Sequence, residues 1–393
     1  GLYVRDINIG TGDLTITDGS DFSNNDLTRL TFNGATTDLF WVGGMNSNNK
    51  TGTFSTGIDN NWTNPDNWST NSGICNNNNM CIPGIKSDVF VDAASFDAGG
   101  TTVIDLDQDG AVNNIDMSLN DDAVTFDDAS TTSNLTVAGN VTLDAQVSFV
   151  NFDNTIEMTG DDAGATHSFD VNTTSLSTVD LLINCTTTTD VIQLSENATF
   201  NQIGIQSGVL ALNSFAATCD RLDANITGTA ARGIDFGTNA KVVVTGGGAT
   251  EVVDFQSAGI TNTNTTGAAE IEFTNAGQVV VELGVNTLSV PDLDFLSSTD
   301  VDILTGGDDN STTVTIGDIT TGAAGDFDLD LVGTRGLRKE VGTITLANAT
   351  TYAINCPDGT AFGTLSSAIE GLVVGTNGDG ELNGEFVEFS GTV

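Results

Sequence analysis

Apolar and polar residues alternate along most of this chain, which is the period-two pattern of half-buried β-strands. The clearest segments are 13–17, 29–33, 88–92, 123–127, 134–137, 140–144, 269–273, 313–318, 326–332 and 342–347. Clusters of Gly, Asn, Asp and Thr separate them and are typical of turns. No segment sustains the apolar period of a long helix, and the best helical candidate is the short stretch at 365–372. The pattern therefore predicts an all-β protein.

Part of this strand pattern occurs twice, in RGIDFGTNAKVVVTGGG and in AEIEFTNAGQVVVELG. The matching positions lie 37 residues apart and are Ile234 and Ile271, Phe236 and Phe273, and the valines 242–244 and 279–281. A repeat of a few strands cannot bury its apolar face alone, whereas stacked repeats share one continuous core. We therefore predict a right-handed parallel β-solenoid (β-helix) with a loop-dominated, Trp-rich insertion near its start.

The alternative architecture is a series of immunoglobulin-like β-sandwiches, each of roughly 100 residues. Such modules typically contain a buried Trp each and are joined by linkers, but Trp41, Trp62 and Trp68 all lie in the first part of the chain. We expect three regions: N-terminal strands at 1–37, a Trp- and Cys-containing module at 38–100, and the solenoid at 101–393.

The charge is strongly one-sided, with 53 acidic against 10 basic side chains and a formal net charge of -43. Such a charge argues against a nucleic-acid backbone or an anionic membrane surface as partner. Hydrophobic residues make up 38% of the chain, which is enough for a core, yet no apolar run approaches the ~18 residues of a membrane span. The composition favours a saline or calcium-rich exterior, where ions screen the self-repulsion.

The five cysteines also point to an exterior location. Cys75 and Cys81 flank the polar loop NNNNM, and a disulfide between them would fix a loop that has no core of its own. Two unpaired thiols, or a metal site with few ligands, are the alternatives. Cys185 and Cys219 each follow an apolar stretch and are expected to be buried free thiols. The partner of Cys356 stays open.

One segment, DLDQDGAVNNID at 105–116, has the spacing of a twelve-residue calcium loop. Gly110 stands at the position of the tight turn. The expected calcium ligands are Asp105, Asp107, Asp109, Asn113 and Asp116. Against this site, the twelfth position is Asp rather than the longer Glu, and neither flank is helical. The competing interpretation is two solenoid strands joined by a DQDG turn.

Residues 38–96 contain FWVGG, then NNWTNPDNWS, then IPG and SDVFVDAASF. This order resembles a module of large secreted surface proteins of Bacteroidota, which are often adhesin-like or gliding-associated. The resemblance implies export, usually by type IX secretion, and display at the cell surface, and it implies no activity. The insert between the GG pair and Trp62 is longer than in that pattern, and the loop between Cys75 and Cys81 is an addition.

The three tryptophans have two interpretations. Three aromatic side chains can hold an Asn-rich loop together, so we expect Trp41, Trp62 and Trp68 to form a small core. The alternative is an exposed platform on which sugar rings stack.

Motifs for catalysis are absent from the sequence: it has no G-x-S-x-G elbow, no Walker loop and no H-E-x-x-H. His167 is the single histidine and stands without a nucleophile motif. Arg335, Arg338 and Lys339 form a basic patch that fits an acidic neighbouring subunit. The expected function is therefore a non-enzymatic, extracellular structural protein, a self-associating fibre subunit or adhesin segment. The alternative is a carbohydrate-binding or carbohydrate-active β-helix protein.

Overall fold

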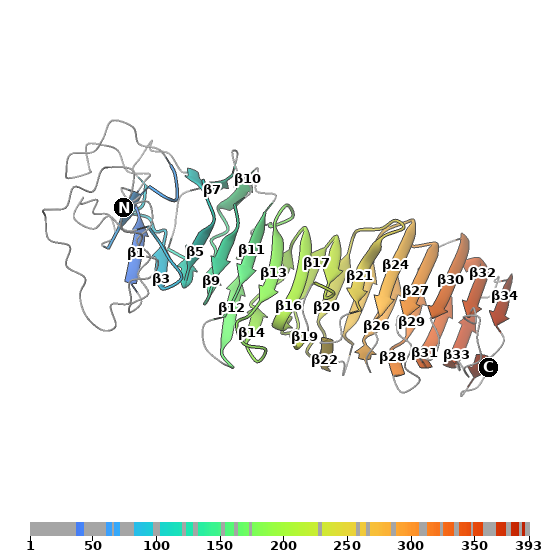
Figure 1. Cartoon of the computed structure of the whole chain (residues 1–393). Coiled ribbons are helices and arrows are strands. Elements are labelled where there is room, and N and C mark those ends of the chain that lie inside the picture. The colour runs from blue at the N-terminus through green and yellow to red at the C-terminus, as the bar shows by residue number, and fades with distance from the viewer. Residues whose placement is uncertain are drawn as a thin grey trace, which may run out of the picture. The chain divides into compact units, whose positions relative to one another are not determined.

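The computed structural model of the chain contains β-strands as its described elements (Figure 1). It describes residues 37–42, 60–64, 67–70, 82–96, 103–119, 123–128, 133–150, 154–160, 164–172, 175–226, 230–256, 260–264, 268–283, 288–305, 313–322, 325–333, 338–346, 349–356, 367–374, 379–384 and 387–389. The chain divides into two compact units. Unit 1 comprises residues 1–161 and 167–179, and unit 2 comprises residues 162–166 and 180–393. The three regions expected from the sequence stay a prediction.

Unit 1 is built from three parallel ladders, which the chain visits in a fixed order on every turn. The first ladder is β4 (Val103–Asp105), β7 (Val124–Asp127) and β10 (Val147–Val150). The second is β5 (Gly110–Val112), β8 (Leu135–Val137) and β11 (Thr155–Met158). The third is β1 (Thr37–Trp41), β3 (Ser87–Phe90), β6 (Asn114–Asp116), β9 (Val141–Thr142) and β12 (Thr166–Asp170). Each turn therefore adds one strand to each of three faces.

Unit 2 repeats this plan with longer strands (Figure 1). Its longest ladder is β13 (Asp180–Asn184), β16 (Gln202–Ala211), β18 (Arg221–Asp223), β21 (Glu251–Phe255), β24 (Gln278–Leu283), β27 (Asp300–Thr305), β30 (Gly325–Gly333), β32 (Ala349–Cys356) and β34 (Asp379–Gly384). A second ladder is β15 (Ala198–Thr199), β17 (Ala216–Cys219), β20 (Lys241–Val244), β23 (Glu270–Phe273), β26 (Asp292–Phe295) and β29 (Ile319–Thr321), followed by the second halves of β31 (Arg338–Leu346) and β33 (Ser367–Val374).

The remaining strands of unit 2 form its third face. They are β14 (Val191–Leu194), the second half of β16, β19 (Arg232–Asp235) and β22 (Ile260–Asn264). Further along the chain come β25 (Leu288–Val290), β28 (Thr313–Ile316), the first halves of β31 and β33, and β35 (Val387–Phe389).

These parallel ladders confirm the prediction of a β-solenoid. A series of immunoglobulin-like sandwiches would consist of antiparallel sheets. All the strand pairs given above are parallel, and β2 (Trp68–Ser69), which pairs with β1, is antiparallel. The sandwich alternative is therefore wrong.

The sequence repeat does not mark the stacking of turns, and the prediction of a short helix was wrong. The 37-residue repeat is not the length of a turn, because Val242 lies beside Ile271 and Ile271 beside Leu293, only 29 and 22 residues further on. Ile234 instead lies beside Asn262, on another face. Apolar and polar residues alternate in a similar way on all faces of the solenoid. The strands that the two copies of the sequence repeat match to one another therefore do not stack. The helical candidate at 365–372 lies largely in the strand β33, because pairing with β31 and β35 outweighs local propensity.

Apolar columns run through the interior of the solenoid. In unit 2, successive turns place Val242, Ile271, Leu293, Ile319 and Ile344 beside one another, each at most 1% exposed. A second column stacks the rings of Phe273 and Phe295 with centroids 4.6 Å apart and planes at 12°. Alternate residues point inward, so the period-two pattern of the sequence is the direct consequence of this packing.

Polar columns at the corners explain the abundance of Asn and Asp. In unit 1, Asn114 donates its side-chain N–H to Asp88 Oδ1 at 2.6 Å, and its own Oδ1 accepts from the Asn140 backbone N–H at 2.6 Å. Asn140 Oδ1 then accepts from the Ser168 backbone N–H at 2.8 Å. A side-chain carbonyl or carboxyl oxygen on one turn therefore satisfies a backbone donor on the next turn. The side chain of Asp can accept these hydrogen bonds as well as that of Asn, and the use of Asp at the corners makes the net charge of the chain more negative.

Candidate functional site

The three tryptophans of unit 1 pack against one another, as the sequence predicts. Trp68 lies between the other two, with ring centroids 5.0 Å from Trp41 and 4.7 Å from Trp62, both in edge-to-face geometry. All three side chains are at most 1% exposed. Trp68 Nε1 donates to the backbone oxygen of Trp62 at 2.8 Å. Since their faces are covered, these indoles do not offer the exposed platform that sugar stacking requires.

The Trp68 segment also closes one edge of a sheet. Phe40 in β1 lies beside Phe90 of β3 in a parallel pair and beside Ser69 of β2 in an antiparallel pair. A strand has two edges, so β2 must lie on the edge of β1 that faces away from β3. The Val42 N–H extends the pairing by donating to Asn67 O at 2.8 Å. An open β-edge invites pairing with another chain, and β2 acts as a cap for this part of β1.

The acidic segment at 105–116 contacts the tryptophan segment directly. Trp62 N donates to Asp105 O at 2.7 Å, and Asp105 N donates to Asn60 O at 2.8 Å. The Asp107 carboxylate accepts from the Thr63 backbone N–H at 3.0 Å and from the Thr63 hydroxyl. The two segments that the sequence singles out separately are therefore parts of one structure, which we call the N-terminal clasp (residues 60–64, 67–70 and 105–110).

The five residues expected to bind calcium have different neighbours in the structure. Asp109 accepts from Asn134 N at 3.0 Å, Asn113 donates to Asp88 at 2.8 Å, and Asp116 accepts from Ser118 N at 2.9 Å. The segment forms β4, a DQDG bend, β5 and β6, so the competing interpretation of solenoid strands describes its backbone. Among the described residues, no group of three or more His, Cys, Asp or Glu is arranged to hold a metal ion. Calcium binding stays a prediction.

Gly110 has a packing role in the clasp. A Cβ at this position would meet Leu106 Cδ1 at 3.0 Å, Leu135 Cδ1 at 3.1 Å and Trp62 Nε1 at 3.2 Å. These distances are shorter than ordinary contacts, so the missing side chain of Gly110 leaves room for the indole of Trp62. The spacing of the acidic segment predicts a calcium-loop turn at this glycine, whereas in the structure Gly110 begins β5.

Several other predicted site residues lie outside the described part of the chain. These are Cys75, Cys81 and Arg335, together with the side chains of Arg338, Lys339 and Cys356. Cys185 and Cys219 are free and buried, which confirms their prediction. Burial and the nearby Asp190 raise the pKa of Cys185 to about 12, and burial raises the pKa of Cys219 further. Both thiols are therefore protonated and unreactive at neutral pH. His167 is buried in β12, at 5% exposure.

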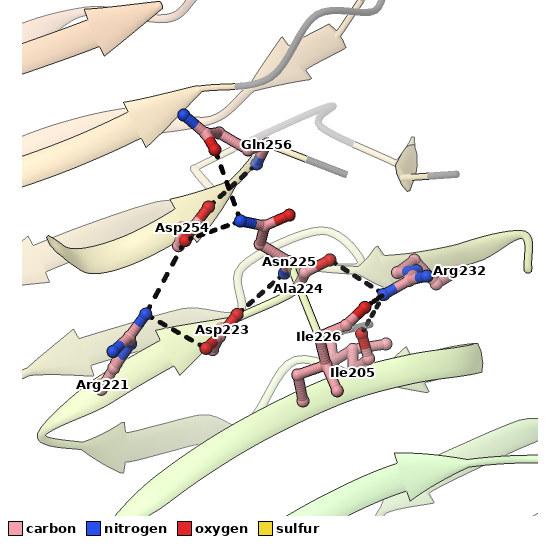
Figure 2. A network of polar contacts seen from close by, with 9 residues as sticks. All are labelled: Ile205, Arg221, Asp223, Ala224, Asn225, Ile226, Arg232, Asp254 and Gln256. Carbon is pink, nitrogen blue, oxygen red and sulfur yellow. Dashed lines mark hydrogen bonds and ion pairs between the residues drawn. The ribbon is translucent and has the colours of Figure 1, made fainter. Parts of the chain in front are cut away.

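Unit 2 contains a buried arginine that the sequence pattern does not indicate. Arg232, at the start of β19, is 1% exposed. Its Nη1 donates to the backbone oxygens of Ile205, Ala224 and Ile226 at 3.2, 3.1 and 2.8 Å (Figure 2). Its Nε donates to Ala230 O at 3.2 Å. Burial lowers the pKa of the guanidinium, and the negative charge of Asp223 partly opposes this. Arg232 therefore ties the segment between β18 and β19 to the preceding turn.

A second network lies close to Arg232 (Figure 2). Arg221 contacts Asp223 at 3.1 Å and Asp254 at 3.7 Å. Asp254 also accepts from the Asn225 side chain at 3.2 Å and from Gln256 N at 3.0 Å. Burial, more than any neighbour, raises the pKa of the Asp254 carboxyl. These bonds join β18 to β21 along the outer surface of the longest ladder.

Both regions hold successive turns of the solenoid together. In the clasp, Trp68 Nε1 and the Asp107 carboxylate bond to Trp62 and Thr63. Around Arg232, the donors are directed at main-chain oxygens. Such arrangements fix the position of neighbouring turns. No family model matches the chain, no curated protein matches it, and no solved structure matches it.

Proposed function

We propose that this chain is a non-enzymatic structural protein of the cell exterior, a subunit of a surface fibre or a segment of a large adhesin. The observation that carries this proposal is the continuity of the in-register columns, such as the one from Val242 to Ile344 in unit 2. Each turn contacts only its neighbours, so a solenoid gains length without needing a larger core. Length and lateral surface are the properties that a fibre or a stalk uses.

Self-association is the second part of the proposal. Parallel ladders join other ladders through their terminal strands by strand addition. The chain already uses this contact internally, because β2 adds to the edge of β1. Copies of the chain are therefore proposed to associate through strand and end contacts, with a basic patch at Arg335, Arg338 and Lys339 against an acidic neighbour.

The proposed location rests on the likeness of residues 38–96 to the secreted Bacteroidota module and on the acidic composition. Export by type IX secretion is the route that this likeness implies. The described part of the chain contains no helix with the length and apolar character needed to span a bilayer.

Electron microscopy and sedimentation of the full chain test the proposal. We expect concentration-dependent oligomers or filaments whose repeat matches the length of one copy. A protein that stays monomeric at all concentrations would contradict self-association. Turnover of a polysaccharide by the same preparation would overturn the non-enzymatic role, and it would favour the carbohydrate-active alternative.

A further inference from the structure

Carboxylates stand in register on adjacent strands of unit 2. On the longest ladder, Asp223 of β18 lies beside Asp254 of β21, and Asp254 lies beside Glu282 of β24. Like charges directly opposite each other on paired strands are destabilising. The single cation that contacts this column is Arg221, as far as the described residues show, and it reaches Asp223 and Asp254 but not Glu282.

The same arrangement occurs on a second face. Glu270 and Glu272 of β23 lie beside Asp292 and Asp294 of β26. Lys241 of β20 contacts Glu270 at 2.8 Å and Glu272 at 2.5 Å. In each column, one basic side chain pairs with the carboxylates nearest to it. The carboxylates of the next turn lie opposite these paired groups, and this basic side chain does not contact them.

The strands that follow each column supply few groups that could offset the repulsion between its carboxylates. Beyond Asp294, β29 supplies the Thr320 hydroxyl, which donates to Asp294 Oδ1 at 2.7 Å. Asp318, which precedes β29, donates its backbone N–H to Asp292 Oδ1 but brings another negative charge. Beside Glu282, β27 supplies the apolar Leu304, and Asp302 of the same strand accepts from Gln278.

The pKa values follow this geometry. The carboxyl pKa is raised for Asp254, Glu282, Asp292 and Asp294, first by burial and then by carboxylates such as Glu251, Asp254, Glu270 and Glu272. A carboxyl group whose pKa is higher in the folded than in the unfolded protein stabilises the fold when it is protonated. This stabilisation is complete below the unfolded pKa of about 4 and is lost as the pH rises through the folded value.

From the two in-register columns we infer that unit 2 is a proton-stabilised scaffold, in which a proton takes the place of the missing cation between turns. The contacts between β21 and β24 and between β23 and β26 tighten as the surroundings become mildly acidic and loosen toward neutral pH. The inference does not depend on the proposed function, since it concerns stability alone.

Denaturant unfolding of the full chain at constant ionic strength, followed by hydrogen exchange of peptides from β21 to β27, tests the inference. We expect unit 2 to unfold at a higher denaturant concentration at about pH 5 than at about pH 7. Asp294→Asn and Glu282→Gln should each raise the midpoint at neutral pH and reduce its dependence on pH. All three tryptophans belong to unit 1, so their fluorescence should show the same transition in wild type and variants.

Asp235→Asn is the matched control, because it removes the same charge from an outward position. Asp235 lies beside Ala211 and Asn264, not beside a carboxylate. We expect this control to leave the midpoint and its pH dependence close to those of the wild type. Equal effects of Asp235→Asn and Asp294→Asn would assign the response to net charge and overturn the inference. A wild-type midpoint that does not rise toward about pH 5 would also overturn it.

Discussion

At the scale of single residues, the tryptophan cluster shows that buried side chains of the same type can contribute differently to the stability of the fold. Trp68 Nε1 has a carbonyl partner on Trp62, whereas Trp41 Nε1 and Trp62 Nε1 are buried with no hydrogen-bond partner among the described residues. A buried polar group without a partner costs free energy. The indole N–H of Trp41 is therefore tolerated because the ring as a whole packs well.

This difference predicts unequal losses of stability from two similar substitutions. Trp68→Phe removes a made hydrogen bond and leaves the Trp62 carbonyl without it, so we expect a loss of unfolding free energy of about 2–4 kcal/mol. Trp41→Phe removes a similar volume together with an unsatisfied donor, so its loss should be smaller by about 1 kcal/mol. Urea unfolding followed by circular dichroism compares the two variants. Equal losses would show that the hydrogen bond contributes nothing.

Gly110 gives a second prediction at this scale. Gly110→Ala places a methyl group against Trp62, Leu106 and Leu135, and we expect a loss of about 1–3 kcal/mol from overpacking. The red shift of tryptophan emission in the folded state would report that the indoles have become exposed. Ala111→Ser, at the next and outward-facing position of β5, should change neither quantity. A stable Gly110→Ala variant with unchanged emission would contradict the packing role.

At the scale of elements, the fold could largely be predicted from the sequence, because period-two alternation is a local signal. The packing of Trp41, Trp62 and Trp68 also followed from residue type and local spacing. The stacking register could not be predicted, since the strands of all three faces show similar alternation. The contact between Thr63 and Asp107 joins residues 44 positions apart, and nothing in the local pattern indicates it.

Arg232 was missed for a related physical reason. A charged residue at the start of a strand normally lies at the surface, and the four carbonyl groups that receive its N–H donors come from two separate segments. The one available signal is that Arg232 precedes Gly233 and the apolar Ile234 in a short strand.

The buried guanidinium makes a clear prediction for β19 and the segment before it. Arg232→Met keeps much of the side-chain volume but leaves the main-chain oxygens of Ile205, Ala224, Ile226 and Ala230 without this donor. We expect a loss of about 1–3 kcal/mol and faster hydrogen exchange around β18 and β19. The matched control is Arg221→Met, because the Arg221 side chain is 34% exposed and its ion pairs should contribute at most about 1 kcal/mol. A smaller loss for Arg232→Met than for Arg221→Met would refute the role of Arg232.

At the scale of the whole molecule, the net charge of -43 is the dominant feature. Much of it is built into the architecture, because carboxylates serve as acceptors at corners and as outward residues on strands. Mutual repulsion of these groups opposes the compact state and is weakened by salt. The protein is therefore expected to depend on its ionic surroundings more than a protein of balanced charge.

Salt titration gives the prediction at this scale. Sodium chloride should raise the thermal midpoint of unfolding steadily as the Debye length shortens from about 30 Å to about 8 Å. If calcium binds at 105–116, calcium chloride at matched ionic strength should raise the midpoint of unit 1 further than sodium chloride does, and the absence of any further increase would contradict this prediction. An extra calcium effect that disappears on joint Asp107→Asn and Asp109→Asn substitution would establish the calcium loop.

The corner columns of unit 1 have a consequence for how such a chain can change its length. Asn114 and Asn140 perform the same task one turn apart, each accepting from the backbone of the following turn. A duplicated or deleted turn would bring its own acceptor and meet an identical donor, so the join needs no new chemistry. The strand β2 could not be duplicated in this way, because it runs antiparallel to β1 and does not continue the parallel stacking. A variant with one turn of unit 1 duplicated or deleted is therefore expected to keep the hydrogen bonds between its turns.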